Sequence, residues 1–424
     1  RLYMKKGEQM KQYIIIGNGI AAAGCIEGIR SKDKDSQIVV ISKEKHPVYC
    51  RPLISYYLEG KTDLERMKYR SEDFYEVNGC KVIYGETAVK INNAHNTVVL
   101  SNGTSLPFSS LCVAAGSSPF VPNFAGLETV ENRFSFMTLD DALTLEKAIT
   151  PNSNVLIIGA GLIGLKCAEG LHGRVKSIKV CDLADKVLSS ILDEDTAPIV
   201  QSYLENNGIE FMMSDSVTKF EPNKAIMKSG KTVCFDILIT AVGVRPNTSL
   251  IAEVGGAVNR GILVDEAMHT SLPNIYAAGD CTEGYDISWG GNRVLALLPN
   301  AYMQGFTAGV NMAGGSKVFD KAIPMNSIGF FGLHIMTAGS YITEKDGGTV
   351  HKELENTSAK KFFVRDGLLK GYILVDKVDR GGIYTSLIRE QTPLDTINFD
   401  LLKENASFMA FSAENRRNKF GGVV

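Results

Sequence analysis

Two glycine-rich turns in the sequence have the spacing that a diphosphate group requires. The first is Gly17-Asn18-Gly19-Ile20-Ala21-Ala22, with Ala22 in place of the third glycine, and the second is Gly159-Ala160-Gly161-Leu162-Ile163-Gly164. Glycine permits the tight turn and lets backbone N–H groups approach the phosphates, while the N-terminus of a following helix adds a partial positive charge. We therefore interpret both segments as nucleotide-binding turns rather than ordinary turns, and expect Leu162 and Ile163 to belong to the second site.

Acidic residues downstream of each turn are candidates for binding a ribose. Asp182 ends the strand that follows the second turn, at the usual distance for this role. A carboxylate there accepts hydrogen bonds from ribose hydroxyls and repels a 2′-phosphate, which favours NADH over NADPH, although Lys186 keeps NADPH open. After the first turn the candidate is Glu44, for which a solvated loop carboxylate is the alternative interpretation.

Apolar runs around the turns predict the elements that position them. Residues 13–16 and 154–158 are predicted strands, each followed by a helix (20–30 and up to 172) and a second strand (37–42 and 177–181). Such a duplication of a βαβ unit implies two nucleotide-binding folds. The strands over 111–116 and 237–243 resemble each other, and their ends supply further expected contacts, Ala115 and Gly116 in the first site and Val242 and Gly243 in the second.

The predicted fold class is α/β, with two Rossmann-like, doubly wound, three-layer domains and a smaller α+β domain at the C-terminus. Residues 361–364 and 371–375 are interpreted as a hairpin of that last domain. The expected boundaries are listed together: residues 10–116 and 244–318 form one nucleotide-binding domain, 117–243 the other, and 319–424 the C-terminal domain. Residues 1–9 are interpreted as a polar extension.

Composition excludes several classes of function. The chain has 424 residues and a formal net charge of -2, so no basic field suggests a nucleic-acid partner or a membrane surface. Its eight cysteines include no Cys-x-x-Cys pair and no cluster with histidine, which predicts no metal site and no secreted disulfide framework. No apolar run approaches the roughly 20 residues of a membrane helix, and no secretion signal is recognised, so we expect a cytoplasmic location.

A more specific string, Thr270–Asp280, resembles the second flavin motif of the pyridine nucleotide-disulfide oxidoreductase superfamily. The resemblance extends to 241–247, 304–305 and 311–315. It implies that the first fold holds the ADP half of FAD, that Gly279 and Asp280 contact the rest of this cofactor, and that the second fold holds NAD(H). A helix N-cap carboxylate is the local alternative for Asp280.

Residues 46–55 look like the corresponding stretch of NADH:rubredoxin oxidoreductases and of the flavin module of NADH-dependent nitrite reductase. By this resemblance Arg51 and Pro52 contact the flavin, whereas a surface arginine is the alternative. The chain departs from related ferredoxin reductases at two positions that meet near the flavin in those proteins. It has Tyr56 where they often have Lys, and Lys166 where they often have Glu.

The resemblance implies an FAD-dependent oxidoreductase that moves electrons between NADH and an iron–sulfur or rubredoxin-like partner, and a homodimer is possible. Two alternatives stay open. The first is a single-cysteine coenzyme A disulfide reductase or an NADH oxidase or peroxidase, with Cys50 as the thiol. The second is an FAD-relay subunit of a larger redox complex. No catalytic residue is obligatory, because the flavin performs the chemistry, and the only candidates are Cys50 and Lys166.

Overall fold

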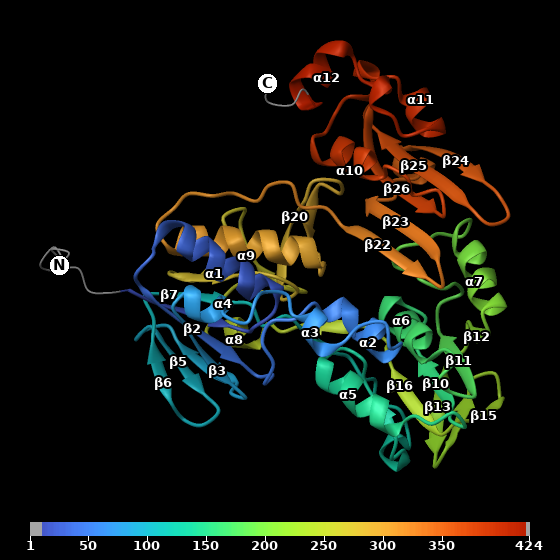
Figure 1. Ribbon diagram of the computed structural model, residues 1–424, viewed down its shortest axis with the longest axis horizontal. Coiled ribbons are helices and arrows are strands. Elements are labelled where there is room, and N and C mark those ends of the chain that lie inside the picture. Colours follow the sequence, from blue (N-terminus) through green and yellow to red (C-terminus); the bar gives the residue numbers. More distant parts are fainter. Residues whose placement is uncertain (1–10, 421–424) are drawn as a thin grey trace, which may run out of the picture.

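The computed structural model of the protein describes residues 11–420. The expected polar extension over residues 1–9, the expected domain start at Met10 and the expected domain end at residue 424 lie outside the described residues. The elements form three packed groups: one from the beginning of the chain together with residues around 250–312, one from the middle, and one from the end (Figure 1).

The first glycine turn belongs to a five-stranded parallel sheet of order β19-β7-β1-β2-β3. Its strands are β1 (Gln12–Ile16), β2 (Gln37–Ser42), β3 (Cys80–Tyr84), β7 (Ser110–Val113) and β19 (Ile275–Ala277). Helices α1 (Ile20–Lys32) and α9 (Leu298–Met312) lie on one side of the sheet, and a small sheet of β4 (Ala88–Asn92), β5 (Thr97–Leu100) and β6 (Ser105–Pro107) lies on the other (Figure 1). The predicted strand–helix–strand unit over residues 13–42 is confirmed.

The second glycine turn belongs to another five-stranded parallel sheet, of order β12-β11-β10-β16-β9. Its strands are β9 (Arg133–Phe134), β10 (Asn154–Ile158), β11 (Ser177–Asp182), β12 (Ile209–Met213) and β16 (Ile237–Thr240). Its helices are α5 (Leu139–Ala148), α6 (Leu162–Leu171) and α7 (Ala197–Asn206), and β13 (Val217–Glu221), β14 (Lys224–Met227) and β15 (Thr232–Cys234) form an antiparallel sheet. The second predicted unit is therefore confirmed as well.

The two strands that resemble each other in sequence, β7 and β16, occupy equivalent places. Each pairs in parallel with the strand that leads into a glycine turn, β7 with β1 and β16 with β10. Where the chain then crosses between the two sheets, β8 (Ser117–Pro119) and β17 (Val244–Pro246) pair in antiparallel fashion. The two crossings therefore lie side by side and tie the nucleotide-binding folds together.

The C-terminal part is built on an antiparallel sheet of order β22-β23-β26-β25-β24. The strands are β22 (Met325–Phe330), β23 (Leu333–Gly339), β24 (Thr349–Leu354), β25 (Ala359–Arg365) and β26 (Leu368–Val375), followed by α10 (Gly382–Arg389), α11 (Phe399–Glu404) and α12 (Ala413–Phe420). The predicted hairpin is confirmed as β25 and β26. The fold is thus α/β with two Rossmann-like units and a smaller α+β part, as predicted, while the boundaries at 116, 243 and 318 stay predictions.

The C-terminal sheet is fixed against the middle of the chain by apolar and ionic contacts. Phe330, Leu333 and Ile335 belong to the same apolar core as the strands around the second glycine turn. Lys361 is only 4% exposed, forms an ion pair with Asp193, and reaches Asp195 at 2.7 Å. Breaking such a buried pair costs several kcal/mol, so this contact holds the two groups of elements together.

The remaining elements are short. They are the helices α2 (Ile54–Leu58), α3 (Leu64–Met67), α4 (Phe74–Val77) and α8 (Ser249–Ala252), the 3-10 turns η1 (Arg51–Leu53), η2 (Leu127–Thr129), η3 (Glu344–Asp346), η4 (Leu394–Thr396) and η5 (Phe408–Ala410), and the strands β18 (Ile262–Leu263), β20 (Thr282–Asp286) and β21 (Gly291–Arg293). Over residues 11–420, no helix combines the length and apolarity that a bilayer crossing needs. The same residues contain no group of three or more His, Cys, Asp or Glu placed to hold a metal ion.

Candidate functional site

The first glycine turn connects β1 to α1 and leaves the N-terminus of that helix open. Gly17 has a φ of +107°, and its amide donates to the Ile41 carbonyl at 2.9 Å. A Cβ atom at Gly17 would lie 2.0 Å from the Ala114 carbonyl oxygen, so only glycine fits beside the end of β7. Gly19 caps α1 without a side-chain hydrogen bond, and a Cβ there would meet nothing within 4 Å. The N-terminus of α1 therefore has no side-chain cap and has room beside its capping glycine, which suits a diphosphate.

Helix α1 is held in place by a close crossing with α9. Ala22 is fully buried. A Cβ at Gly305 would lie 1.9 Å from the Ala21 carbonyl oxygen, and one at Gly309 would lie 2.1 Å from that of Cys25. These glycines let the two helix backbones touch, so the open end of α1 is fixed relative to α9.

Helix α9 also supports the flavin-motif segment. The Gly279 amide donates to the Gln304 side-chain oxygen at 2.8 Å, and Gly279 has a φ of +84°. Gln304 belongs to the 304–305 part of the resemblance, which predicts no role for its side chain. Only the structure reveals its contact, because 25 positions separate the two partners.

Asp280 follows directly, and its carboxyl group lies partly buried near a positive charge. Burial raises the pKa of Asp280 above its usual range, while the charge of Arg51 opposes the shift. Asp280 and Arg51 come from segments far apart in sequence. The fold brings these two predicted flavin contacts close enough for their charges to interact.

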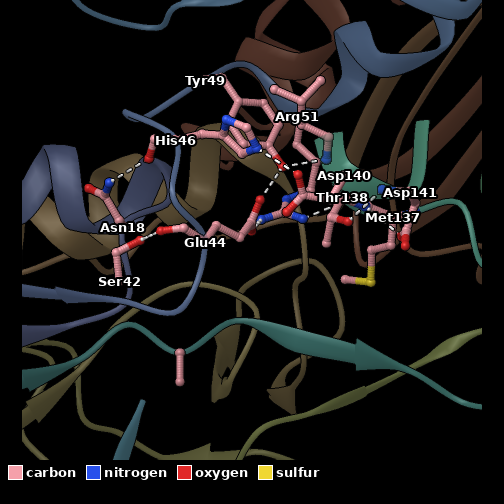
Figure 2. A network of polar contacts seen from close by, with 12 residues as sticks. Asn18, Ser42, Glu44, His46, Tyr49, Arg51, Met137, Thr138, Asp140 and Asp141 are labelled. Carbon is pink, nitrogen blue, oxygen red and sulfur yellow. Dashed lines mark hydrogen bonds and ion pairs between the residues drawn. The ribbon is translucent and has the colours of Figure 1, made fainter. Parts of the chain in front are cut away.

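Glu44 lies at the centre of a polar network that reaches from the first fold to the beginning of α5 (Figure 2). Its Oε1 accepts a hydrogen bond from Arg51 Nη2 at 2.7 Å, and its Oε2 accepts one from the Tyr49 hydroxyl at 2.7 Å. Arg51 Nη1 also donates to the Met137 carbonyl at 2.8 Å, and the Leu139 amide donates to the Tyr49 oxygen at 2.9 Å. Glu44 therefore orients Arg51. Each oxygen of its carboxylate still has a lone pair that can accept a hydrogen bond from a ribose.

Two neighbours of Arg51 in sequence have different surroundings. Pro52 is exposed at the start of η1. Cys50 is half-buried, its amide donates to the Met67 carbonyl at 2.8 Å, and burial raises the pKa of its thiol. A raised thiol pKa reduces the thiolate fraction near neutral pH, and the thiolate is the form that acts as a nucleophile.

The second glycine turn repeats the geometry of the first. Gly159 has a φ of +112°, and a Cβ there would lie 2.2 Å from the Ala241 carbonyl oxygen. Gly161 caps α6 without a side-chain hydrogen bond and faces free space. At Gly164 a Cβ would lie 2.0 Å from the Gly159 carbonyl oxygen, so the third glycine allows α6 to pack on its own turn. Leu162 and Ile163 are partly exposed in the first turn of α6.

Asp182 lies at the end of β11 and is bound to that turn. Its Oδ2 accepts the Ala160 amide at 2.7 Å, and its Oδ1 accepts the Ala184 amide at 2.8 Å. Each carboxylate oxygen has a second lone pair. The side chain thus fixes the shape of the glycine turn. Because Asp182 is partly exposed, its carboxylate can still accept a further hydrogen bond from a ligand.

The strand ends that were expected to border the cofactors lie at the crossings between the two folds. Gly116 and Gly243 both have positive φ, and a Cβ at either would meet nothing within 4 Å. Asn247 Nδ2 donates to the Ala115 carbonyl at 2.8 Å, and the Asn247 amide donates to that of Gly116 at 3.0 Å. Asn247 lies in the 241–247 part of the resemblance, and these contacts add it to the residues at the crossing. Val242 is partly exposed beside Gly243.

Lys166 is occupied by contacts within the protein. It forms an ion pair with Glu169 one turn along α6, and its Nζ donates to the Gly329 carbonyl at 3.1 Å. The same Nζ lies 4.7 Å from the centroid of the Tyr56 ring. Lys166 therefore joins α6, α2 and the end of β22. Its partner Glu169 was not among the residues predicted for the site.

Comparisons with known proteins agree with this architecture. A family model described as pyridine nucleotide-disulphide oxidoreductase matches residues 11–305. Among solved structures, the covalent putidaredoxin reductase–putidaredoxin complex has a chain of the same fold, with a TM-score of 0.86, 21% identity, and coverage of 93% of this chain and 96% of that one.

Curated relatives extend the similarity over almost the whole sequence. NADH-dependent phenylglyoxylate dehydrogenase subunit epsilon of Aromatoleum evansii is 32% identical over 403 residues, which are 92% of this chain and 94% of the relative. Nitrite reductase [NAD(P)H] of Bacillus subtilis (strain 168) is 30% identical over 392 residues, which are 91% of this chain but 48% of the relative, so the chain spans about half of that protein. The chain belongs to the pyridine nucleotide-disulphide oxidoreductase family, as the flavin motif had predicted.

Proposed function

We propose that the protein holds FAD at the first glycine turn and NAD(H) at the second, and moves electrons between NADH and a redox-protein partner that carries an iron–sulfur centre. The observation that carries this proposal is the pair of helix N-termini at Gly19 and Gly161, each without a side-chain cap and with room beside its capping glycine. Because α1 and α6 begin in the same way, each after the C-terminal end of the central strand of a parallel sheet, the chain offers two separate sites for dinucleotides.

For the first site we propose direct contacts from Gly17, Gly19 and Ala22 in the turn, from Ala115 and Gly116 at the crossing, and from Gly279 and Asp280 in the flavin motif. Arg51, Pro52 and Glu44 complete the set. The chain's own geometry fits such a group, since the turn is open, Asp280 is partly buried, and Arg51 is held by Glu44 and the Met137 carbonyl. A bound flavin supplies two-electron exchange with nicotinamide and one-electron exchange with iron–sulfur centres.

For the second site we propose contacts from Gly159, Gly161, Leu162, Ile163, Gly164, Asp182, Val242 and Gly243. We propose a preference for NADH over NADPH, because a carboxylate at the end of β11 repels a 2′-phosphate. The short span from Asp182 to the turn, 2.7 Å to the Ala160 amide, keeps that charge close to the helix N-terminus that binds the diphosphate.

We also propose that residues 10–116 and 244–318 form the FAD domain, 117–243 the NAD domain and 319–424 the C-terminal domain. The first sheet takes β1, β2, β3 and β7 from before residue 116 and β19 from after residue 244, which supports one FAD domain made of two segments. The paired crossings β8 and β17 support boundaries near 116 and 243, and the change to an antiparallel sheet supports one near 318.

The partner is proposed from the relatives. The one that matches over 92% of this chain is named as a subunit of an NADH-dependent dehydrogenase, and the chain spans about half of a nitrite reductase. Both names suggest that this kind of chain acts beside other redox units. The same observation favours a second candidate function, an FAD-relay subunit that has no NADH turnover in isolation.

An anaerobic titration tests the proposal. NADH is added in steps to the purified, FAD-reconstituted chain while the visible spectrum is recorded, and the series is repeated with candidate iron–sulfur proteins. Bleaching of the flavin by about one equivalent of NADH supports the first half-reaction, and faster partner reduction than oxygen reduction supports the acceptor. A chain that binds no flavin contradicts the proposal, whereas bleaching only in the presence of copurified subunits favours the relay function.

A further inference from the structure

A pocket of about 250 Å³ lies between the side of α9 and the end of α10, and neither glycine turn contributes to it. Three aromatic side chains and three cations share its lining: Tyr302, Phe306, Phe319, Lys317, Lys321 and Arg389. Asp320 is the acidic residue among its lining groups. The pocket therefore combines an apolar wall with a surplus of positive charge.

Two polar atoms in the lining residues lack partners. Thr307 Oγ1 and Arg389 Nε are both buried and have no hydrogen-bond partner among residues 11–420. Thr307 is only 1% exposed. Buried polar atoms without partners are rare in folded proteins and point to a missing water, ion or ligand. Both residues line one pocket, so a ligand with oxygen acceptors that draws these two shielded atoms toward it would supply the partners that they lack.

The positive charge comes mainly from Arg389 and Lys317. Lys321 is paired with Glu390 at 2.8 Å, which leaves it less able to attract a further anion. Lys317 Nζ lies 5.7 Å from the centroid of the Phe306 ring, and Arg389 Nη2 lies 4.0 Å from Met303 Sδ. Arg389 is partly buried against this apolar group, where water screens its charge less than in the open, whereas Lys317 is exposed.

The geometry points to a second binding site, for a small organic carboxylate with an apolar body about the size of one ring. A carboxylate matches the fork of a guanidinium and accepts hydrogen bonds from both Arg389 and Thr307. The aromatic side chains of Tyr302 and Phe306 would cover the apolar body. A volume of about 250 Å³ lies below the usual range for drug-sized ligands, so a dinucleotide does not fit.

Ligand-observed NMR with the FAD-reconstituted full chain tests this site, with 3-phenylpropionate as the probe. We expect saturable binding with a dissociation constant on the order of 1 mM. The neutral amide of the same acid and inorganic phosphate serve as comparison probes. Both should bind at least about tenfold more weakly, because the amide has no negative charge and phosphate has no apolar body.

Variants locate the site. Arg389→Gln should weaken 3-phenylpropionate binding about tenfold or more, and Thr307→Val should weaken it several-fold. Arg365→Gln is the matched control, because Arg365 Nε is also buried without a hydrogen-bond partner, although it lies 3.5 Å from the Asp366 carboxylate, and it does not line the pocket. This variant should bind the probe as the unchanged chain does. If Arg389→Gln fails to fold, Lys317→Gln replaces it, with a smaller expected loss.

Several results would overturn the inference. No saturable binding up to about 20 mM, which is well above the expected constant, excludes the site. If the neutral amide binds equally well, the pocket recognises only the apolar body and the proposal is wrong. If phosphate binds equally well, the pocket recognises only the negative charge and the proposal is also wrong. Unchanged binding in both Arg389→Gln and Thr307→Val places the probe elsewhere.

Discussion

Lys166 Nζ lies 4.7 Å from the centroid of the Tyr56 ring, so the two positions at which the sequence departs from related ferredoxin reductases face each other. The contact is of the cation–π kind, in which a ring face attracts a positive charge. Glu169 adds an ion pair from the next turn of α6, and its Oε1 accepts the Phe331 amide at 2.7 Å. The cation therefore has protein partners on several sides, which indicates a positioning rather than a catalytic role.

Replacing Lys166 by Met should destabilise the fold by about 3 kcal/mol, because the buried Glu169 would keep a charge without its cation. Glu169 is 5% exposed, so water cannot replace the lost partner. Urea unfolding followed by circular dichroism measures the change in the free energy of unfolding.

The double variant Lys166→Met/Glu169→Gln is the control for this prediction. It removes both charges, so it should recover a large part of the stability lost in Lys166→Met. If the single variant is as stable as the unchanged chain, the ion pair contributes nothing measurable.

Asp182→Asn should shift the nucleotide preference toward NADPH. Removing one negative charge beside the place of a 2′-phosphate changes the ratio of kcat/KM for NADPH over NADH by about tenfold, since such a charge repels by roughly 1 kcal/mol or more at short range. The loss of one acceptor for the Ala160 or Ala184 amide should also lower both activities somewhat.

Asp185→Asn is the matched control for nucleotide preference, because Asp185 has a 75% exposed side chain three residues further on. Its ratio should stay unchanged. An equal shift in both variants would mean that general charge, and not the position of Asp182, decides the preference.

Much of the fold follows from the sequence because the signals are local. A continuous apolar run that ends in glycine and is followed by small residues predicts β1 and α1, and the same reasoning predicts β10 and α6. The buried faces of such parallel strands are filled by the run itself. Gly17 and Gly159 were predictable for the same reason, since a tight turn under a neighbouring strand leaves no room for a Cβ atom.

The side-chain partners could not be predicted in the same way. Arg51 reaches the Met137 carbonyl 86 positions away, and Glu169 binds the Phe331 amide 162 positions away. No periodicity encodes which side chains meet when separate domains pack. Glu44 is an example. Its position in the sequence predicts a contact with a ribose, but only the structure reveals that Arg51 and Tyr49 both donate to its carboxylate.

Glu44→Gln should weaken FAD retention about tenfold, because Arg51 and Tyr49 donate to different carboxylate oxygens, whereas an amide has one acceptor oxygen and no charge. The readout is the FAD dissociation constant from flavin fluorescence during dilution. Asp140→Asn is the control, since Asp140 pairs with His46 in the same network and is 63% exposed. Equal retention in Glu44→Gln and the unchanged chain would remove Glu44 from the FAD site.

Cys50→Ser should retain full NADH-dependent turnover, because burial raises the pKa of the thiol and leaves little thiolate at neutral pH. Alkylation by iodoacetamide, followed by mass spectrometry, should label exposed Cys234 before Cys50, and labelling of Cys50 should accelerate as the pH rises toward its pKa. Loss of turnover in Cys50→Ser would instead favour thiol chemistry of the coenzyme A disulfide reductase or NADH oxidase kind.

Asp280→Asn should stabilise the FAD-free protein at pH 8 while weakening FAD binding. In the unfolded chain the Asp280 carboxyl loses its proton near pH 4, whereas burial keeps the proton on the folded protein to higher pH, against the opposing charge of Arg51. Above pH 4 the unfolded chain therefore binds fewer protons at this residue, and stability falls as the pH rises to the folded pKa.

Urea unfolding of the FAD-free protein at pH 4 and pH 8 should show a smaller fall in the free energy of unfolding for the variant than for the unchanged chain. An equal fall in both proteins would mean that Asp280 is no harder to ionise in the folded chain than in water, and that the partly buried carboxylate does not oppose folding in the absence of its cofactor.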